Sequence, residues 1–202
     1  TTLFRSGLII FLLLFGLFSC GVISAAESEK EFDYIIPSQQ LEEVSLEIGF
    51  QVVLPLKKKE TFKDIWVFDG HLLVLTSRNY LYFIERETGI IRCGMELTSS
   101  GLPVCRPSFA DGKFWFMVGN QLLVVKPEIC MVVDSHFCKH VGRSAVCSVA
   151  VNDSFIYVSG LTNRLNALVK DGFWRKFNVT AYDDSLINSI IATDNDVYFA
   201  TA

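Results

Sequence analysis

A four-strand unit that recurs about every 42 residues constrains the fold of this chain more than any other feature. Turns rich in Asp, Asn and Gly, flanked by apolar runs, begin at Asp69, Asp111, Asn152 and Asp194, with spacings of 42, 41 and 42 residues. Asp and Asn tolerate the left-handed backbone of tight turns, and Gly adopts it without steric cost. Each of these turns therefore predicts a two-stranded hairpin.

Two further short apolar runs follow each hairpin. In the first unit, HLLVLT leads to a turn at 77–79, YLYFIE leads to a turn at 86–89, and IIRCGMEL completes the unit. Beyond the N-terminal segment, only 38–46 is expected to form a helical turn or two, because no long stretch has apolar residues at the helical spacing of 3.6. Antiparallel four-stranded units at this period are typical of β-propellers. We therefore expect an all-β chain, a β-propeller with four-stranded antiparallel blades.

The propeller is expected to be incomplete in this chain. Residues 50–202 contain about three and a half units, preceded by a linker with a short helix over 27–49. The apolar run QVVLPL at 51–56 precedes the first turn by the spacing of an outermost strand. We expect it to be the closing strand of a blade whose other strands lie C-terminal to this chain, which predicts a fragment of a six- to eight-blade protein.

An uncharged apolar stretch, GLIIFLLLFGLF at 7–18, lies near the N-terminus. As a helix it would span about 18 Å, too short to cross a bilayer comfortably. It predicts a signal peptide over 1–26, cleaved after Ala26. The first six residues, TTLFRS, resemble a translated sequencing adapter rather than natural protein.

Two alternatives to that cleavage stay open. The sequence LFSCG at 17–21 resembles a lipoprotein box, in which Cys20 would be the lipid attachment residue. An uncleaved anchor ending near Ile23 is the other alternative. All three interpretations export the chain, to the periplasm or the extracellular space, either free or as a membrane-anchored lipoprotein.

Part of the first unit resembles a known repeat. In LYFIERETGIIRC at 81–93, Glu85 stands at an acidic position, Thr88 and Gly89 form the turn, and Cys93 stands where a Trp is usual. The stretch is similar to the repeat of quinoprotein-like (PQQ-repeat) β-propellers. The dehydrogenases of that superfamily carry adjacent cysteines near the quinone, and this sequence has none. The resemblance therefore implies a non-catalytic member.

We accordingly predict an exported, non-catalytic β-propeller rather than an enzyme, which binds a protein or peptide partner on a propeller face without a cofactor. The alternative is a quinone-dependent dehydrogenase whose catalytic residues lie in other blades. Nucleic acid is not expected as a partner, because the net charge is −4 and the pI about 5.4. The one basic run, Lys57 to Lys59, predicts a solvated turn. Contact with a membrane is expected only through a lipid anchor.

One candidate metal site stands out. In an extended strand His136, Cys138 and His140 would point to one face, as two imidazoles and a thiolate suited to zinc or copper. The alternative is a connecting segment with Cys138 turned inward.

The six cysteines leave five once Cys20 is removed or acylated, so internal pairing cannot be complete. Cys105 and Cys147 lie 42 residues apart on neighbouring inner strands, where a disulfide and two buried free thiols both remain open.

Two glycosylation patterns, at Asn152 and Asn178, matter in a eukaryotic secretory pathway. A polysaccharide-binding propeller would need exposed aromatic residues, but Trp66, Trp115 and Trp174 lie in strand runs and are expected in the core.

Overall fold

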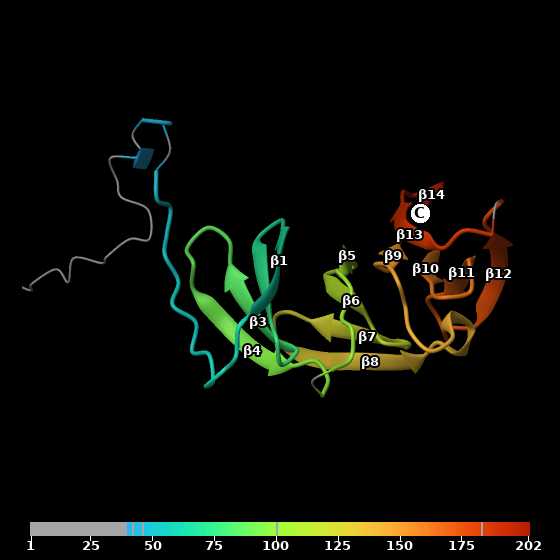
Figure 1. The fold of residues 1–202 in the computed structure, drawn as a ribbon, viewed down its shortest axis with the longest axis horizontal. Helices are drawn as coiled ribbons and strands as arrows, with labels where there is room; N and C mark the ends of the chain where they lie inside the picture. Colours follow the sequence, from blue (N-terminus) through green and yellow to red (C-terminus); the bar gives the residue numbers. More distant parts are fainter. Residues whose placement is uncertain (1–39, 42, 46, 100, 183) are drawn as a thin grey trace, which may run out of the picture.

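The structure is a computed structural model that describes residues 40–202 except 42, 46, 100 and 183. Its strands form three four-stranded antiparallel sheets and one two-stranded sheet, which stand side by side in an arc (Figure 1). Blade 1 holds β1 (Phe62–Phe68), β2 (His71–Thr76), β3 (Tyr80–Glu85) and β4 (Ile91–Glu96). Blade 2 holds β5 (Ser108–Ala110), β6 (Lys113–Val118), β7 (Gln121–Lys126) and β8 (Met131–Phe137). Blade 3 holds β9 (Ala150–Val151), β10 (Phe155–Ser159), β11 (Arg164–Val169) and β12 (Arg175–Thr180), and blade 4 holds β13 (Ile187–Ala192) and β14 (Val197–Thr201).

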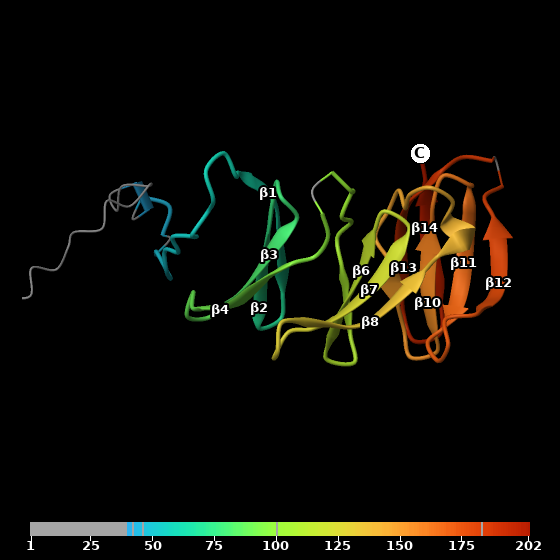
Figure 2. The ribbon, with the colours of Figure 1, turned by 90° about the horizontal axis from the view of Figure 1, so that it is seen from below.

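The strands of each blade pair in chain order, so every connection within a blade is a hairpin. All four turns predicted from the sequence join the first two strands of a blade. Gly70 has φ 72° and Asp111 has φ 54°, the left-handed backbone for which these residue types are suited. Figure 2 shows the same succession of blades from below, and the propeller expected from the sequence is confirmed.

The core lies between blades, as stacking requires. Leu73, Leu75 and Phe83 of blade 1 pack against Phe114 and Phe116 of blade 2, and all five side chains are at most 1% exposed. A second cluster joins blades 2 and 3, and a third joins blades 3 and 4. Strands that bury both faces are apolar throughout, which is why the sequence shows continuous runs rather than alternation.

A repeated asparagine ties each blade to the connection that leaves it. Asn79, Asn120 and Asn163 stand where the second turn of a blade ends, and their backbone carbonyls accept hydrogen bonds from Leu97, Cys138 and Ala181. Their side-chain Nδ2 groups donate to the carbonyls of Leu102 (2.9 Å), Gly142 (3.0 Å) and Asp184 (3.3 Å). The same residue thus satisfies backbone groups of an irregular connection in three successive blades.

A second repeat links the outer rims of neighbouring blades. Cys93 on β4 forms a disulfide with Cys130 in the β7–β8 turn, with a Cα–Cα distance of 6.3 Å. One blade further on, His136 on β8 stacks on Phe173 in the β11–β12 turn, with ring centroids 5.1 Å apart. In both places the third turn of a blade contacts the outer strand of the blade before it.

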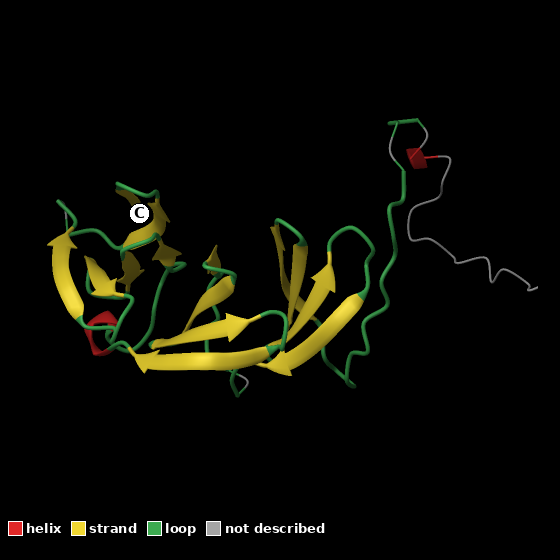
Figure 3. Cartoon of the chain, turned by 180° about the vertical axis from the view of Figure 1, so that it is seen from behind, coloured by secondary structure: helices red, strands yellow, loops and turns green. Residues whose placement is uncertain are grey.

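The segment 50–57 runs along the free flank of blade 1 and is assigned to no strand (Figure 3). Val52, Leu54 and Leu56 pack on the cluster formed by Val74, Tyr82 and Ile84, while the residues between them face solvent. The Tyr82 hydroxyl donates to the Pro55 carbonyl at 3.2 Å. The segment is thus extended and alternating, as the prediction of a closing strand requires, but it pairs with no strand in the described chain.

The predicted helix over 38–46 amounts to a helical turn at 40–41 within the described residues. The predicted signal peptide, Ala26 and the lipid attachment residue Cys20 lie outside the described residues. In the part of the chain that the structure describes, no helix has the length and apolar character needed to span a membrane.

Candidate functional site

The two faces of the propeller follow from the hairpin topology. The first and third turns of a blade lie at one end, and the second turn lies with the connections between blades at the other. We call these ends the turn face and the loop face. The turn face comprises the segments between the strands of hairpins β1–β2, β3–β4, β5–β6, β7–β8, β9–β10, β11–β12 and β13–β14. The loop face comprises 57–61, the β2–β3, β6–β7 and β10–β11 turns, and the connections between blades.

Charge is divided unequally between these faces. The turn face is acidic, with Asp69, Glu87, Asp111, Glu128, Asp153, Asp171, Asp194 and Asp196 in its turns, beside Arg86 and Lys170. The loop face is basic, with exposed Lys57, Lys58, Lys59, Arg78, Lys139 and Arg143. Among its described residues, the acidic ones are Glu60, which is buried, Asp184, and the exposed Glu96 at the adjoining end of β4. A chain of net charge −4 therefore presents a local positive surface.

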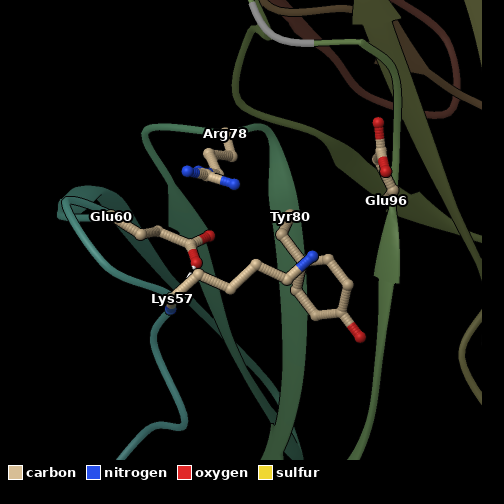
Figure 4. A pocket seen from close by; sticks show the side chains of 5 residues that line it. All are labelled: Lys57, Glu60, Arg78, Tyr80 and Glu96. Atoms are coloured by element: carbon tan, nitrogen blue, oxygen red, sulfur yellow. Dashed lines mark hydrogen bonds between the residues drawn. The ribbon is translucent and has the colours of Figure 1, made fainter.

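A cavity of about 300 Å³ lies at the blade 1 end of the loop face, lined by Lys57, Glu60, Arg78, Tyr80 and Glu96 (Figure 4). Figure 4 shows Lys57, Glu60 and Arg78 close together, whereas Glu96 stands apart on the end of β4.

The Glu60 residue is 8% exposed, and its carboxylate accepts hydrogen bonds from the Thr76 hydroxyl (2.5 Å) and the Lys57 backbone N–H (2.8 Å). These two bonds, in that order, lower the pKa of Glu60, with weaker help from the Arg78 and Lys57 charges.

Those bonds also shape the basic turn that precedes β1. The Glu60 backbone N–H donates to the Lys57 carbonyl at 2.9 Å, and Lys59 takes a left-handed φ of 65°. The Arg78 guanidinium reaches the Lys58 carbonyl at 3.4 Å. The turn is thus held from inside by Glu60, and its three lysines are exposed, as the sequence predicted for Lys57 to Lys59.

A larger hollow of about 650 Å³ adjoins this turn between blade 1 and the connection to blade 2. Lys63 and Asn79 line it together with the stretch 101–103, and the Lys63 ammonium donates to Asn79 Oδ1 at 3.3 Å. The hollow is open and shallow, so it can receive part of a partner chain rather than a buried small molecule. The two hollows and the basic turn together form the candidate site.

The predicted metal set is not brought together. Strand β8 ends at Phe137, and Cys138 precedes a short 3₁₀ helix (Lys139–Val141), so the two-residue alternation fails. Cys138 is 3% exposed within the core between blades 2 and 3, and burial raises the pKa of its thiol to about 11. Across the described residues, no three His, Cys, Asp or Glu side chains are grouped to hold a metal ion. The inward Cys138 of the alternative interpretation is what the structure shows.

Of the two possibilities left open for Cys105 and Cys147, the structure shows free thiols. Cys147 is buried and Cys105 is half-buried. Burial, followed by the nearby Cys105, raises the pKa of Cys147 to about 12. The disulfide joins Cys93 to Cys130 instead, a pair that the sequence did not suggest.

Trp66 and Trp115 are core residues at 5% exposed, as expected, but Trp174 is not. It stands just before β12, is 53% exposed, and has the Lys176 ammonium 5.4 Å from its ring centroid.

The sequence did not predict the loop face, because Lys57 to Lys59 and Arg78 lie about 20 residues apart and form no single basic run. The order of the turns within each blade would have predicted this face. Alternate turns of an antiparallel blade lie at opposite ends, so the turn residues can be sorted into two faces from the sequence alone.

No family model and no curated protein matches the sequence. Solved structures match in fold. The chain is similar to the WD40 domain of Neurospora crassa Pan2, with 16% identity and a TM-score of 0.53 over 68% of this chain and 41% of that one. It is also similar to BamB from Moraxella catarrhalis (16% identity, TM-score 0.51, 65% and 40% coverage) and to Saccharomyces cerevisiae Sqt1 (10% identity, TM-score 0.54, 70% and 42%).

These likenesses establish the β-propeller fold of this chain, which spans about two fifths of the length of each matched structure.

Proposed function

We propose that this chain is part of an exported, non-catalytic β-propeller scaffold whose loop face binds an acidic segment of a partner protein. The observation that carries the proposal is the basic loop face on an otherwise acidic protein. Propellers such as the matched structures supply rigid faces for protein interaction, which is a coarse support for the same role.

The chemistry of the site favours carboxylates. Lys58 and Arg78 are exposed on adjacent turns, and the acidic side chain beside them, Glu60, already accepts two hydrogen bonds. Glu60 keeps its charge but is buried against these two donors, and Lys58 and Arg78 remain exposed to a partner. Lysine and arginine on a face of like sign attract an acidic segment and speed its association.

Export is supported by two independent features. The apolar stretch at 7–18 has the length of a signal peptide core. The Cys93–Cys130 disulfide is the kind of bond that persists in oxidising compartments and is rare in the cytosol.

The relationship to quinoprotein-like repeats belongs to the same proposal. Two residues that carry the resemblance are in contact, because Glu85 accepts a hydrogen bond from the Thr88 hydroxyl at 2.6 Å within the β3–β4 turn.

The test measures binding of a fluorescent peptide of alternating Glu and Gly to the mature chain. Lys58→Glu with Arg78→Glu should weaken binding at least about tenfold, and binding should fall as salt rises. Arg86→Glu with Lys126→Glu changes an exposed cation of the turn face and another at the adjoining end of β7; it is the matched control and should bind as the parent does. Equal binding by both double variants would overturn the proposal, as would tighter binding of a single-stranded oligonucleotide of equal charge.

A further inference from the structure

Two Asn-x-Ser/Thr patterns occur in the chain, and the fold treats them in opposite ways. The first, at Asn152, lies in the β9–β10 turn, and Asn152 is 9% exposed. Its Nδ2 donates to the Thr193 carbonyl at 2.9 Å, and its Oδ1 accepts from the backbone N–H groups of Ser154 and Phe155. This side chain links blade 3 to blade 4, so its amide nitrogen is occupied by the fold.

The second pattern lies on the outside of the molecule. Asn178, Val179 and Thr180 are all exposed on β12, the outermost strand of blade 3. Asn178 pairs through its backbone with Asn166 of β11, while the other edge of β12 pairs with no strand of the described chain. An amide nitrogen at this position can carry a bulky group without displacing core side chains.

We propose that Asn178 is an N-glycosylation site and that Asn152 is not. This inference rests on the proposed export, and in addition on passage through a eukaryotic secretory pathway. The donor is an oligosaccharide linked to a polyisoprenyl pyrophosphate, and the transferase is supplied by the host membrane. Nδ2 of Asn178 forms a bond to C1 of the first sugar, the bond between C1 and the pyrophosphate oxygen breaks, the lipid pyrophosphate leaves, and one amide proton is lost to the transferase base.

The glycan would have a structural consequence at this position. An exposed outer strand offers unpaired N–H and C=O groups to any other extended chain, and proteins protect such edges with charge, bulges or coverage. On β12 the apolar Phe177 (39% exposed) and Val179 (43% exposed) flank Asn178. Because side chains alternate along a strand, Phe177 and Val179 point away from the face that carries Asn178, and a hydrophilic oligosaccharide on Asn178 would hinder another chain from pairing along the open edge of β12.

The test uses the full chain expressed in cultured insect cells, once with its own N-terminal segment and once behind a heterologous signal peptide. Secreted protein is compared before and after digestion with peptide N-glycosidase F. Thr180→Ala removes the acceptor pattern at Asn178, and Ser154→Ala is the matched control that removes the pattern at Asn152 while leaving Asn152 in place. Both hydroxyl residues are exposed, so neither change disturbs the core.

We expect one glycan on the parent and on Ser154→Ala, and none on Thr180→Ala. Two outcomes would overturn the inference: a glycan that persists in Thr180→Ala, or secreted parent protein with no glycan behind the heterologous signal. A glycan that appears with the heterologous signal but not with the native segment would leave the site standing and refute the proposed export.

Discussion

Removing the Cys93–Cys130 disulfide should lower the stability of the propeller by several kilocalories per mole. The bond joins residues 37 apart in the sequence and connects blade 1 to blade 2. In the chain-entropy account, closing a loop of this size raises the free energy of the unfolded chain, and so stabilises the folded state, by about 4 kcal/mol at 25 °C. Because the bond closes a loop between blades rather than within one, its loss should loosen their stacking as well.

The assay is urea unfolding of Cys93→Ser with Cys130→Ser, followed by tryptophan fluorescence. With a slope of about 2 kcal/mol per molar urea, a loss of about 4 kcal/mol lowers the midpoint by about 2 M. Reduction of the parent with dithiothreitol should reproduce the shift. Cys105→Ser, which changes a free and half-buried thiol, is the control and should move the midpoint far less.

The reasoning would be refuted by a parent whose midpoint is the same with and without reductant. It would also fail if peptide mapping of the unreduced protein recovered Cys93 and Cys130 in separate alkylated peptides.

Three further changes test other parts of the structure. Glu60→Gln should lower the free energy of unfolding by about 1 kcal/mol at pH 7. Because the folded-state pKa of Glu60 is lowered, its stabilisation is full above the unfolded-state pKa and is lost as the pH falls through the folded-state pKa. The unfolding curves of parent and variant should therefore converge in acid. Asn120→Ala should lose about 1 kcal/mol in urea unfolding, since the Gly142 carbonyl loses its donor at 3.0 Å, and an unchanged midpoint would show that the asparagine repeat carries no stability. Burial raises the pKa of the Cys138 thiol to about 11 and that of the Cys147 thiol to about 12, so both should resist iodoacetamide at pH 8 in the folded protein and react in urea. Peptide mass spectrometry would measure the labelling. Rapid labelling of the folded protein would contradict their burial.

The strand order and turn positions were predictable because they depend on local chemistry. Asp, Asn and Gly at the turns and continuous apolar runs between them are short-range signals, and they recur at a fixed period. The structure does not bring His136, Cys138 and His140 together, and the reason is local too. A two-residue alternation holds only inside a strand, and β8 ends within the motif, which sequence alone does not show at single-residue precision.

The sequence did not predict the disulfide, because the repeat period relates Cys105 to Cys147 and not Cys93 to Cys130. Cys105 and Cys147 occupy matching positions in successive units, and matching positions belong to sheets that pack about 10 Å apart. A disulfide needs Cα atoms within about 7 Å. Contacts between blades therefore join unlike positions, such as Cys93 on an outer strand and Cys130 in a turn. The period alone cannot reveal such a pair.

Neighbouring blades also make contacts between unlike positions at the segment 51–56, whose role as a closing strand stays a prediction. At the rim, Cys93 of β4 meets Cys130 in the third turn of blade 2, and His136 of β8 meets Phe173 in the third turn of blade 3. The corresponding turn of blade 1 holds Gly89, with φ 71°, and the ring of Phe50 lies against it, so that a Cβ there would stand 2.6 Å from the ring carbons.

Phe50, Cys93 and His136 are 43 residues apart in turn, so the segment that begins at Phe50 contacts blade 1 as β4 contacts blade 2 and as β8 contacts blade 3. The next alternate positions agree, because Val52 packs on blade 1, Met95 on the core shared with blade 2, and Cys138 on the core shared with blade 3. An extended segment that makes an outer strand's contacts to the following blade, without pairing to a strand of the described chain, is the arrangement that the closing-strand prediction requires. That arrangement explains why a sequence with no strand partner nearby keeps a strict alternation of packed and exposed residues.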